Sequence, residues 1–289
     1  MAIASGESKL DLRLKYYAIY GIIVDEYGGL KQMDLHALLK RIDTTKVWID
    51  DKRPLVPKEV KELDAYFRID MTYTSNALEG NSLTLTETKV LLEDGLTVGG
   101  KPMRDHYEAT GHADAYDYML KAARNTPFVF SEDLIKQLHN LFYQKIDKNA
   151  AGVYRDIQVF ITGTEYVPPP ADEVPVLMEE LAAELTEKWD SEHPVRLASY
   201  AHQRFVDIHP FEDGNGRTAR LLMNLILINR GYQIVSIPPV LRQEYINAIS
   251  AGRRGGSKPG GALAKFIAEC EIEAQKDFCR MFHVKPPSK

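Results

Sequence analysis

The stretch that decides the fold is His209-Pro210-Phe211-Glu212-Asp213-Gly214-Asn215-Gly216-Arg217-Thr218-Ala219-Arg220. It brings an imidazole, carboxylates, glycines and arginines together between two apolar segments. Residues 195–208 carry apolar side chains at helical spacing, and residues 221–228 form an almost unbroken apolar run. The pattern predicts a loop between two helices, the second of them buried.

The residue types in this loop indicate phosphate chemistry. Gly214, Asn215 and Gly216 stand at the start of the second helix, where free backbone N–H groups favour an anion. Arg217 and Arg220 follow in its first turns, where the helix dipole disfavours a cation by about 0.3–1 kcal/mol each, so an anionic partner is expected. The guanidinium fork suits bidentate phosphate contact.

Two further residues of the loop supply a metal ligand and a base. Asp213 provides a carboxylate for a metal ion. Mg²⁺ is commonly held by one or two carboxylates together with substrate phosphates, and Mn²⁺ could take its place. His209 titrates near neutral pH and as a neutral base could take the proton of an attacking hydroxyl. The alternatives are a purely structural turn and a zinc hydrolase, which the absence of an HExxH pattern disfavours.

Composition narrows the class of protein. The 289 residues are 44% hydrophobic, enough for a proper core, and the net charge of −5 offers no basic field for nucleic acid. No apolar run reaches the length of a membrane span, and we recognise no signal peptide. With only Cys270 and Cys279, no disulfide framework can be built, so a cytoplasmic protein without nucleic-acid or membrane partners is expected.

The chain as a whole predicts a mainly α fold. Residues 1–84 are expected to form an N-terminal helical region, with an apolar helix over 14–27, a linker over 46–57 and a helix over about 58–79 that Gly80 and Asn81 end. A core over 85–235 follows, and 236–289 supply C-terminal helices. Where the N-terminal region meets the core, Thr84 and Glu87 have capping-box spacing. Alternating side chains over 156–167 predict one β-hairpin.

The twelve-residue stretch resembles the HPFxDGNGRxxR signature of the Fic family of protein adenylyltransferases, and matches it at every specified position. The resemblance implies a Fic-type helical core with a β-hairpin flap that docks the target protein, formed here by Ile157, Gln158, Val159, Phe160 and Ile161. It further implies that His209 deprotonates a Ser, Thr or Tyr hydroxyl of the target, which attacks the α-phosphate of ATP and releases pyrophosphate. Asp213 would hold the metal, and Gly214, Asn215 and Gly216 the phosphates.

The same resemblance assigns the remaining nucleotide contacts. Arg217 would stabilise charge moving toward the pyrophosphate, and Arg220 would hold the γ-phosphate. Tyr245 is similar in position to residues that line the family's adenine pocket, although a packing role is an equal alternative for a tyrosine there.

A second, shorter motif, Ser75-x-x-x-Glu79-Gly80, resembles the family's inhibitory motif. Glu79 at a helix C-terminus and Arg220 at a helix N-terminus each oppose their local dipole, so a salt bridge between them would relieve both. We predict that ion pair. It would occupy the arginine expected to bind the γ-phosphate and leave the resting enzyme weakly active.

Several functional alternatives stay open. Glu79 could position a water that hydrolyses AMP from a modified target. The backbone N–H groups of Gly214, Asn215 and Gly216 could instead bind ATP without transfer, as in a regulatory module, or another phosphate-linked group could be transferred. The target is not deducible, since strand addition accepts many extended peptides. The helices before residue 46 could form a homodimer contact or merely cover the core.

Overall fold

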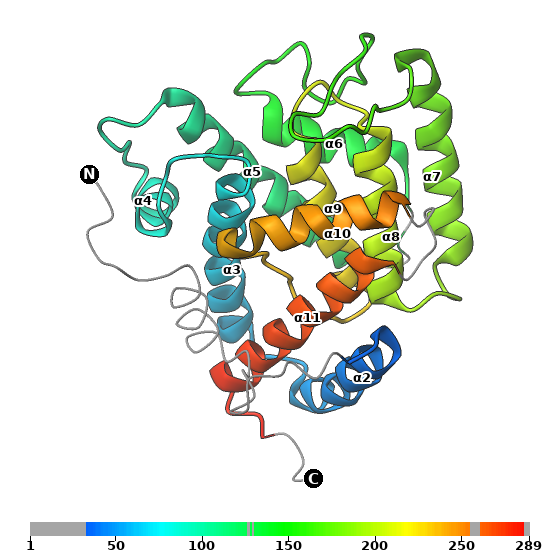
Figure 1. Ribbon diagram of the computed structural model, residues 1–289. Helices are drawn as coiled ribbons and strands as arrows, with labels where there is room; N and C mark the ends of the chain where they lie inside the picture. The colour runs from blue at the N-terminus through cyan, green and yellow to red at the C-terminus, as the bar shows by residue number, and fades with distance from the viewer. Residues whose placement is uncertain (1–32, 126–127, 129, 255–260, 286–289) are drawn as a thin grey trace, which may run out of the picture.

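The protein folds into helices joined by irregular loops (Figure 1). The computed structural model describes residues 33–125, 128, 130–254 and 261–285. In chain order the elements are α2 (Leu35–Lys52), α3 (Pro57–Ala77), α4 (Leu85–Lys89), the π-helical η1 (Val90–Asp94), α5 (Met103–Ala123), α6 (Glu132–Tyr143), the 3₁₀ turn η2 (Ala171–Glu173), α7 (Val174–Lys188), α8 (Pro194–Ile208), α9 (Asn215–Asn229), the 3₁₀ turn η3 (Pro239–Leu241), α10 (Arg242–Arg254) and α11 (Ala262–Met281). The mainly α prediction is confirmed.

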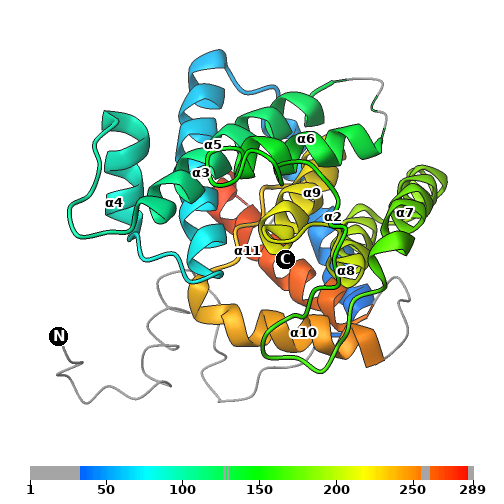
Figure 2. The ribbon, with the colours of Figure 1, turned by 90° about the horizontal axis from the view of Figure 1, so that it is seen from above.

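Helix α9 is the centre of the molecule. Its residues from Leu221 to Leu227 are buried throughout, and burying each such aliphatic side chain contributes about 1.5–3 kcal/mol. Helices α8, α5 and α6 pack against it, and Figure 2 shows it surrounded on several sides. A helix that is apolar all round must be interior. The predicted helix–loop–helix connection is therefore confirmed, with residues 209–214 between α8 and α9.

Helix α3 brings the second motif to the start of α9. It begins with Pro57 at its first turn, ends at Ala77, and leads into Gly80, whose φ of 93° suits glycine. Its sides pack on α5 and α9. The chain then enters α4 through the predicted capping box: Thr84 Oγ1 accepts from the Glu87 N–H at 3.2 Å, and the Glu87 carboxylate accepts from the Thr84 N–H at 2.7 Å.

The linker predicted over 46–57 is wrong in its first half. Helix α2 continues to Lys52, because Ile49 is fully buried and α2 packs on α11, while the polar residues around Ile49 face outward. Tertiary packing overrides the polar composition there. The break itself contains Pro54, between the end of α2 at Lys52 and the start of α3 at Pro57. The helix predicted over 14–27 lies outside the described residues.

The predicted β-hairpin is also wrong: residues 156–167, which we call the flap segment, contain no strand. Ile157 and Phe160 are 54% and 77% exposed, so no buried face holds two strands together, and an isolated hairpin is marginal in water. The arms are joined by a side chain instead, since Gln158 Nε2 donates to the Pro168 carbonyl at 3.1 Å. Pro168, Pro169 and Pro170 have no N–H to offer a ladder.

Within the part of the chain that the structure describes, no helix is both long and apolar enough to cross a bilayer.

Candidate active site

The side chain of Asn215 bonds the backbone of the loop between α8 and α9 at two points. Its Oδ1 accepts from the Phe211 N–H at 3.0 Å and its Nδ2 donates to the Phe211 carbonyl at 2.7 Å. The Phe211 ring is fully buried beneath the loop. The predicted contact of Asn215 with phosphate stays a prediction; in the structure its side chain fixes the loop before the first turn of α9.

Replacing Asn215 by alanine is therefore expected to lower the free energy of unfolding by about 1–3 kcal/mol, because the buried Phe211 N–H and carbonyl lose their partner. Urea denaturation followed by circular dichroism measures this change. Asn247→Ala, at an exposed position of α10, serves as the control and should change the stability by less than about 0.5 kcal/mol. Equal stability of the two variants would contradict the role assigned to Asn215.

The first turn of α9 is built for an anion. Gly214 caps the helix with φ 80°, and a Cβ there would lie 2.7 Å from the Phe142 ring, so only glycine fits. The N–H groups of Asn215, Gly216 and Arg217 have no acceptor within the helix, by the geometry of any helix start. We call these N–H groups the nest.

A carboxylate of the chain itself lies over this nest. A Cβ added at Gly216 would lie 2.2 Å from Glu79 Oε1, so Glu79 packs directly on the glycine where the phosphates were predicted to bind. Its side chain keeps 35% of its surface exposed. The glycine thus permits a close anionic neighbour, and the neighbour in this structure is Glu79.

The predicted ion pair between Glu79 and Arg220 is present. Arg220 Nη2 lies 2.8 Å from Glu79 Oε1, and Arg220 is almost wholly buried. The hydroxyl and carbonyl of Ser75 accept two more hydrogen bonds from Arg220, at 2.9 Å and 2.8 Å. Burial raises the pKa of Glu79, but the charges of Arg220 and Arg217 outweigh it, so the pKa is lowered and Glu79 is ionised at neutral pH.

Tyr245 lies behind this pair rather than beside open space. Its hydroxyl accepts from Arg220 Nη1 at 3.3 Å and is 2.7 Å from His202 Nε2, and the residue is 3% exposed. Burial and the charge of Arg220 lower the pKa of His202 to about 3, so that imidazole is neutral. In this conformation the Tyr245 hydroxyl helps to hold the Arg220 guanidinium in place.

Arg217 belongs to a second network that the sequence did not reveal. Its Nη1 lies 3.0 Å from Glu108 Oε1, and its guanidinium stacks over the Phe142 ring, 4.5 Å from the centroid. Arg104, one turn before Glu108 on α5, bonds Glu108 and reaches Asp213 at 2.5 Å. Arg104 and Glu108 have the spacing of an ordinary surface ion pair, so nothing in the sequence marked them.

Asp213 suits a hard cation only together with oxygen atoms from a substrate. Its side chain is 41% exposed and bonds the Gly214 N–H as well as Arg104 and Arg217. Among the described residues no group of three or more His, Cys, Asp or Glu side chains could hold a metal alone. A single open carboxylate fits Mg²⁺ that completes its shell with phosphate and water oxygens.

His209 lies at the last turn of α8 in a left-handed conformation, with φ 52°. Its half-buried ring places Nδ1 3.4 Å from the Val206 carbonyl, which favours the proton on Nδ1 and leaves Nε2 as the acceptor. Burial lowers the pKa of His209 from 6.5, and the charges of Arg155 and Arg253 lower it further. The imidazole is therefore neutral at pH 7, as a general base requires.

His139 of α6 is a further site residue that the sequence did not reveal. Its ring stacks on Phe211, with centroids 3.7 Å apart and planes 4° from parallel. Nδ1 accepts from the Gly152 N–H, so Nε2 carries the proton and donates to the Asp213 carbonyl at 3.0 Å. Burial lowers the pKa of His139 to about 4, which keeps this tautomer at neutral pH. His139 thus fixes the backbone of Asp213, the residue predicted to hold a metal.

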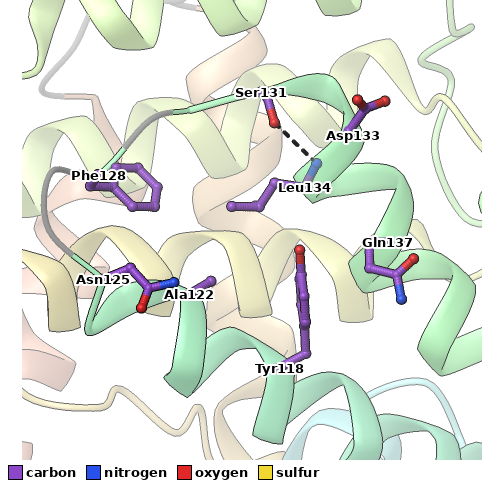
Figure 3. Close-up of a pocket in the computed structure, with 8 residues that line it drawn as sticks. All are labelled: Tyr118, Ala122, Asn125, Phe128, Ser131, Asp133, Leu134 and Gln137. Atoms are coloured by element: carbon purple, nitrogen blue, oxygen red, sulfur yellow. Dashed lines mark hydrogen bonds between the residues drawn. The ribbon is translucent and has the colours of Figure 1, made fainter.

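A surface pocket of about 450 Å³ lies elsewhere, between the last turn of α5 and the first turn of α6 (Figure 3). Asp133 is its charged lining residue, and Ser131, Asn125 and Gln137 add neutral polar groups. Its lining residue Gln137 lies about 7.5 Å along α6 from Phe142, whose ring contacts Arg217 of the motif. With an acid and no base in its lining, it does not suit a polyphosphate.

Comparison with known proteins agrees with this geometry. A model described as Fic/DOC family matches residues 129–227. The protein adenylyltransferase Fic of Drosophila mojavensis is 35% identical over 208 residues, 72% of this chain and 40% of that protein. The corresponding protein of Drosophila persimilis is 36% identical, with 72% and 39% covered. The chain thus spans about two fifths of the length of these curated relatives.

Solved structures agree on the fold. A Fic domain containing signaling protein from Bacteroides thetaiotaomicron superposes with a TM-score of 0.75 at 28% identity, covering 86% of this chain and 99% of that one. Fic-1 from C. elegans gives a TM-score of 0.75 at 25% identity, covering 97% and 78%. The helical architecture, the complete twelve-residue signature and these relatives lead to one conclusion: the chain belongs to the Fic/DOC family.

Proposed function

We propose that the chain is a protein adenylyltransferase, which moves AMP from ATP to a Ser, Thr or Tyr hydroxyl of a target protein and is restrained by Glu79. One observation carries the proposal. The complete signature builds an anion nest with a buried arginine, and that arginine is paired with a carboxylate of the chain itself. An anion-binding site that is occupied by a carboxylate of the same chain is expected of a nucleotide-binding enzyme that is inhibited in its resting state.

The proposed chemistry begins at His209. Nε2 accepts the proton of the target hydroxyl while the hydroxyl oxygen bonds to the α-phosphorus of ATP. The bond from that phosphorus to the bridging oxygen breaks, and pyrophosphate leaves with the electron pair. The nest and Arg217 hold the charge that builds up on the departing phosphates.

Arg220 decides whether ATP binds productively. In the observed state Glu79 takes the guanidinium that would otherwise receive the γ-phosphate. Both ligands are anions on one cation, so they compete, and ATP must displace Glu79 to align its α-phosphate with His209. The contact is reversible because Glu79 lies on the turn after α3, a third exposed, rather than within the helix.

We propose Mg²⁺, with Mn²⁺ as a substitute, as the cation that Asp213 holds beside the phosphates. When bound it neutralises phosphate charge. Asp213 supplies the carboxylate, and Arg104 must yield the oxygen that it now contacts.

Replacing Asp213 by asparagine should raise the Mg²⁺ concentration that half-saturates transfer by about tenfold or more, because a neutral amide is a weaker ligand for a hard cation. Transfer measured across a Mg²⁺ titration checks this. Glu212→Gln, at the exposed neighbouring carboxylate, is the matched control and should leave the Mg²⁺ dependence unchanged. The same shift in both variants would mean that surface charge, and not Asp213, sets the dependence.

The flap segment is the proposed docking site for the target. Its Ile157, Phe160 and Val167 side chains are 54%, 77% and 57% exposed, and its backbone lacks a strand partner within the described chain. An extended peptide could add as a strand to such an edge. Because backbone bonds require little of the target's sequence, the target remains to be identified.

The test uses a Glu79→Gly variant with Mg²⁺ and ATP labelled at either the α- or the γ-phosphate. The proposal expects protein labelled by the α-labelled ATP and not by the γ-labelled ATP. Labelling by both would indicate a different group transfer, and nucleotide binding without any labelling would favour a non-catalytic module. Removal of AMP from prelabelled protein, lost in the variant, would favour the hydrolase alternative in which Glu79 positions water.

We further propose that the protein acts in the cytoplasm. Both cysteines, Cys270 and Cys279, are free thiols, as a reducing compartment would keep them.

A further inference from the structure

Arg155 is a buried cation just before the flap segment, and the motifs above give it no role. It is 3% exposed. Its recorded side-chain hydrogen bonds all end on backbone carbonyl oxygens, none on a carboxylate. A buried charge is costly unless its hydrogen bonds are satisfied, so these bonds hold Arg155 in one geometry.

Two of these bonds join the two arms of the flap segment. Nη1 donates to the Ile157 carbonyl at 2.9 Å, at the start of the segment, and Nη2 donates to the Pro169 carbonyl at 2.6 Å, just beyond its end. In the absence of a hairpin ladder, this planar fork and Gln158 set the distance between the arms.

The other bonds join Arg155 to the loop that carries the base. Nε donates to the His209 carbonyl at 2.9 Å, and Nη2 approaches the Ile208 carbonyl at 3.5 Å. The backbone N–H of Arg155 donates to the Pro210 carbonyl at 2.9 Å. One residue thus bonds three consecutive carbonyls around His209.

These bonds matter because the His209 backbone is strained. Its φ of 52° is in the left-handed region that non-glycine residues disfavour, and such a conformation persists only where its surroundings impose it. The bond from Arg155 Nε fixes the His209 carbonyl and, with it, the direction in which the imidazole leaves the backbone.

We propose that Arg155 is a positioning residue that ties both arms of the flap segment to the backbone of His209. Seating a target on the flap and aligning the base are then one event, because one guanidinium spans both. Arg155 touches no reacting atom. The inference rests on the proposed function for its consequence in transfer, while the structural linkage can be tested without any activity.

The structural test compares Arg155→Lys and Arg155→Gln with the unaltered chain. Lysine keeps the positive charge but lacks the several N–H donors of the planar guanidinium. Glutamine keeps a planar N–H donor but carries no charge. In each folded variant, the imidazole NMR signals of His209, identified by their loss in His209→Asn, should shift or broaden. Signals of the buried His112 and His202 should not move. Amide hydrogen exchange in the flap segment, where the Tyr166 N–H donates to Thr164 Oγ1, should become faster.

Arg230→Lys is the matched control. Arg230 also donates to a backbone carbonyl, that of Trp189 at 2.8 Å, but at the far end of α9. It should leave the His209 signals and the exchange of the flap segment unchanged. If it changes them as Arg155→Lys does, general loosening of the fold explains the effect and the proposal fails.

The functional arm places Arg155→Lys in the Glu79→Gly background. AMP transfer to lysate proteins should fall about tenfold or more, since a misplacement of about 1 Å at a catalytic group can cost about a hundredfold. Binding of a nonhydrolysable ATP analogue, measured by calorimetry, should be preserved, because Arg155 bonds none of the nest residues.

Each outcome bears on the proposal. Unchanged His209 signals in a folded variant would overturn it, and so would failure of both variants to fold, which would make Arg155 a general structural residue. Unchanged transfer in an active background would overturn the linkage to alignment. If the Glu79→Gly parent transfers nothing, the proposed function fails, and the NMR and exchange measurements still decide on Arg155.

Discussion

Replacing Glu79 by glycine is expected to raise the rate of AMP transfer by about tenfold or more at saturating Mg²⁺. A charge-assisted hydrogen bond such as that between Glu79 and Arg220 contributes about 1.5–3 kcal/mol, and about 1.4 kcal/mol corresponds to a tenfold change. Without Glu79, ATP no longer competes with an internal carboxylate for Arg220. The measurement is incorporation of α-labelled AMP into protein, variant against unaltered chain.

The same substitution should lower stability. Arg220 is buried, and its remaining partners, Ser75 and Tyr245, are uncharged. We expect a loss of about 1–3 kcal/mol in the free energy of unfolding, below the cost of a wholly buried pair because Glu79 is a third exposed. Activity that rises as stability falls distinguishes a regulatory contact from a structural one.

Two further variants sharpen this prediction. Glu79→Gln removes the charge with little change of shape and should activate partly, whereas Glu62→Gln, at an exposed position far from the motif on α3, controls for the loss of a surface carboxylate. Because the pKa of Glu79 is lowered, the ion pair is present at neutral pH and is lost only as the pH falls below the ordinary value of 4.5. Equal transfer by the unaltered chain and Glu79→Gly would refute inhibition.

The sequence predicted the elements whose cause is local. The buried helix α9 follows from an apolar run, the end of α3 from Gly80, and the capping box from the spacing of Thr84 and Glu87. The ion pair of Glu79 with Arg220 could also be predicted, because each charge is unfavourable beside its own helix dipole and the two charges are opposite in sign.

The errors come from features set by tertiary packing. Residues 46–52 were predicted to be part of a linker, yet Ile49 is fully buried and α2, which contains them, packs on α11. The sequence of the flap segment alternates as in a strand, but a stable strand needs a partner strand and a buried face. In the structure, Arg155 instead donates hydrogen bonds to carbonyl groups of both arms.

The site residues that the sequence did not reveal act through contacts between elements that are far apart in the chain. His139 reaches the loop from α6 and Glu108 reaches Arg217 from α5. A histidine within a helix resembles any core residue, and a glutamate four residues after an arginine resembles any surface pair. Only the packing of α5 and α6 on α9 brings them to the motif.

Replacing His209 by asparagine in the Glu79→Gly background is expected to lower transfer by about 10²–10⁴-fold, the usual contribution of a general base. Asparagine is preferable to alanine here because it tolerates the left-handed φ of 52°, so the loop should keep its geometry while losing the base. Binding of a nonhydrolysable ATP analogue should remain, since the nest and Arg220 are untouched.

The pH dependence gives an independent check on His209. Burial, with the charges of Arg155 and Arg253, lowers its pKa from 6.5, so the neutral base predominates at pH 7. Transfer by the Glu79→Gly variant should therefore be nearly level above pH 6.5 and fall at lower pH as the imidazole takes up a proton. In His209→Asn the transfer rate should be low and should no longer fall further as the pH is lowered. If His209→Asn keeps both the transfer rate and the fall in rate at low pH, another group must accept the proton. The assignment of His209 as the base would then be wrong, even though the chain matches the signature at every specified position.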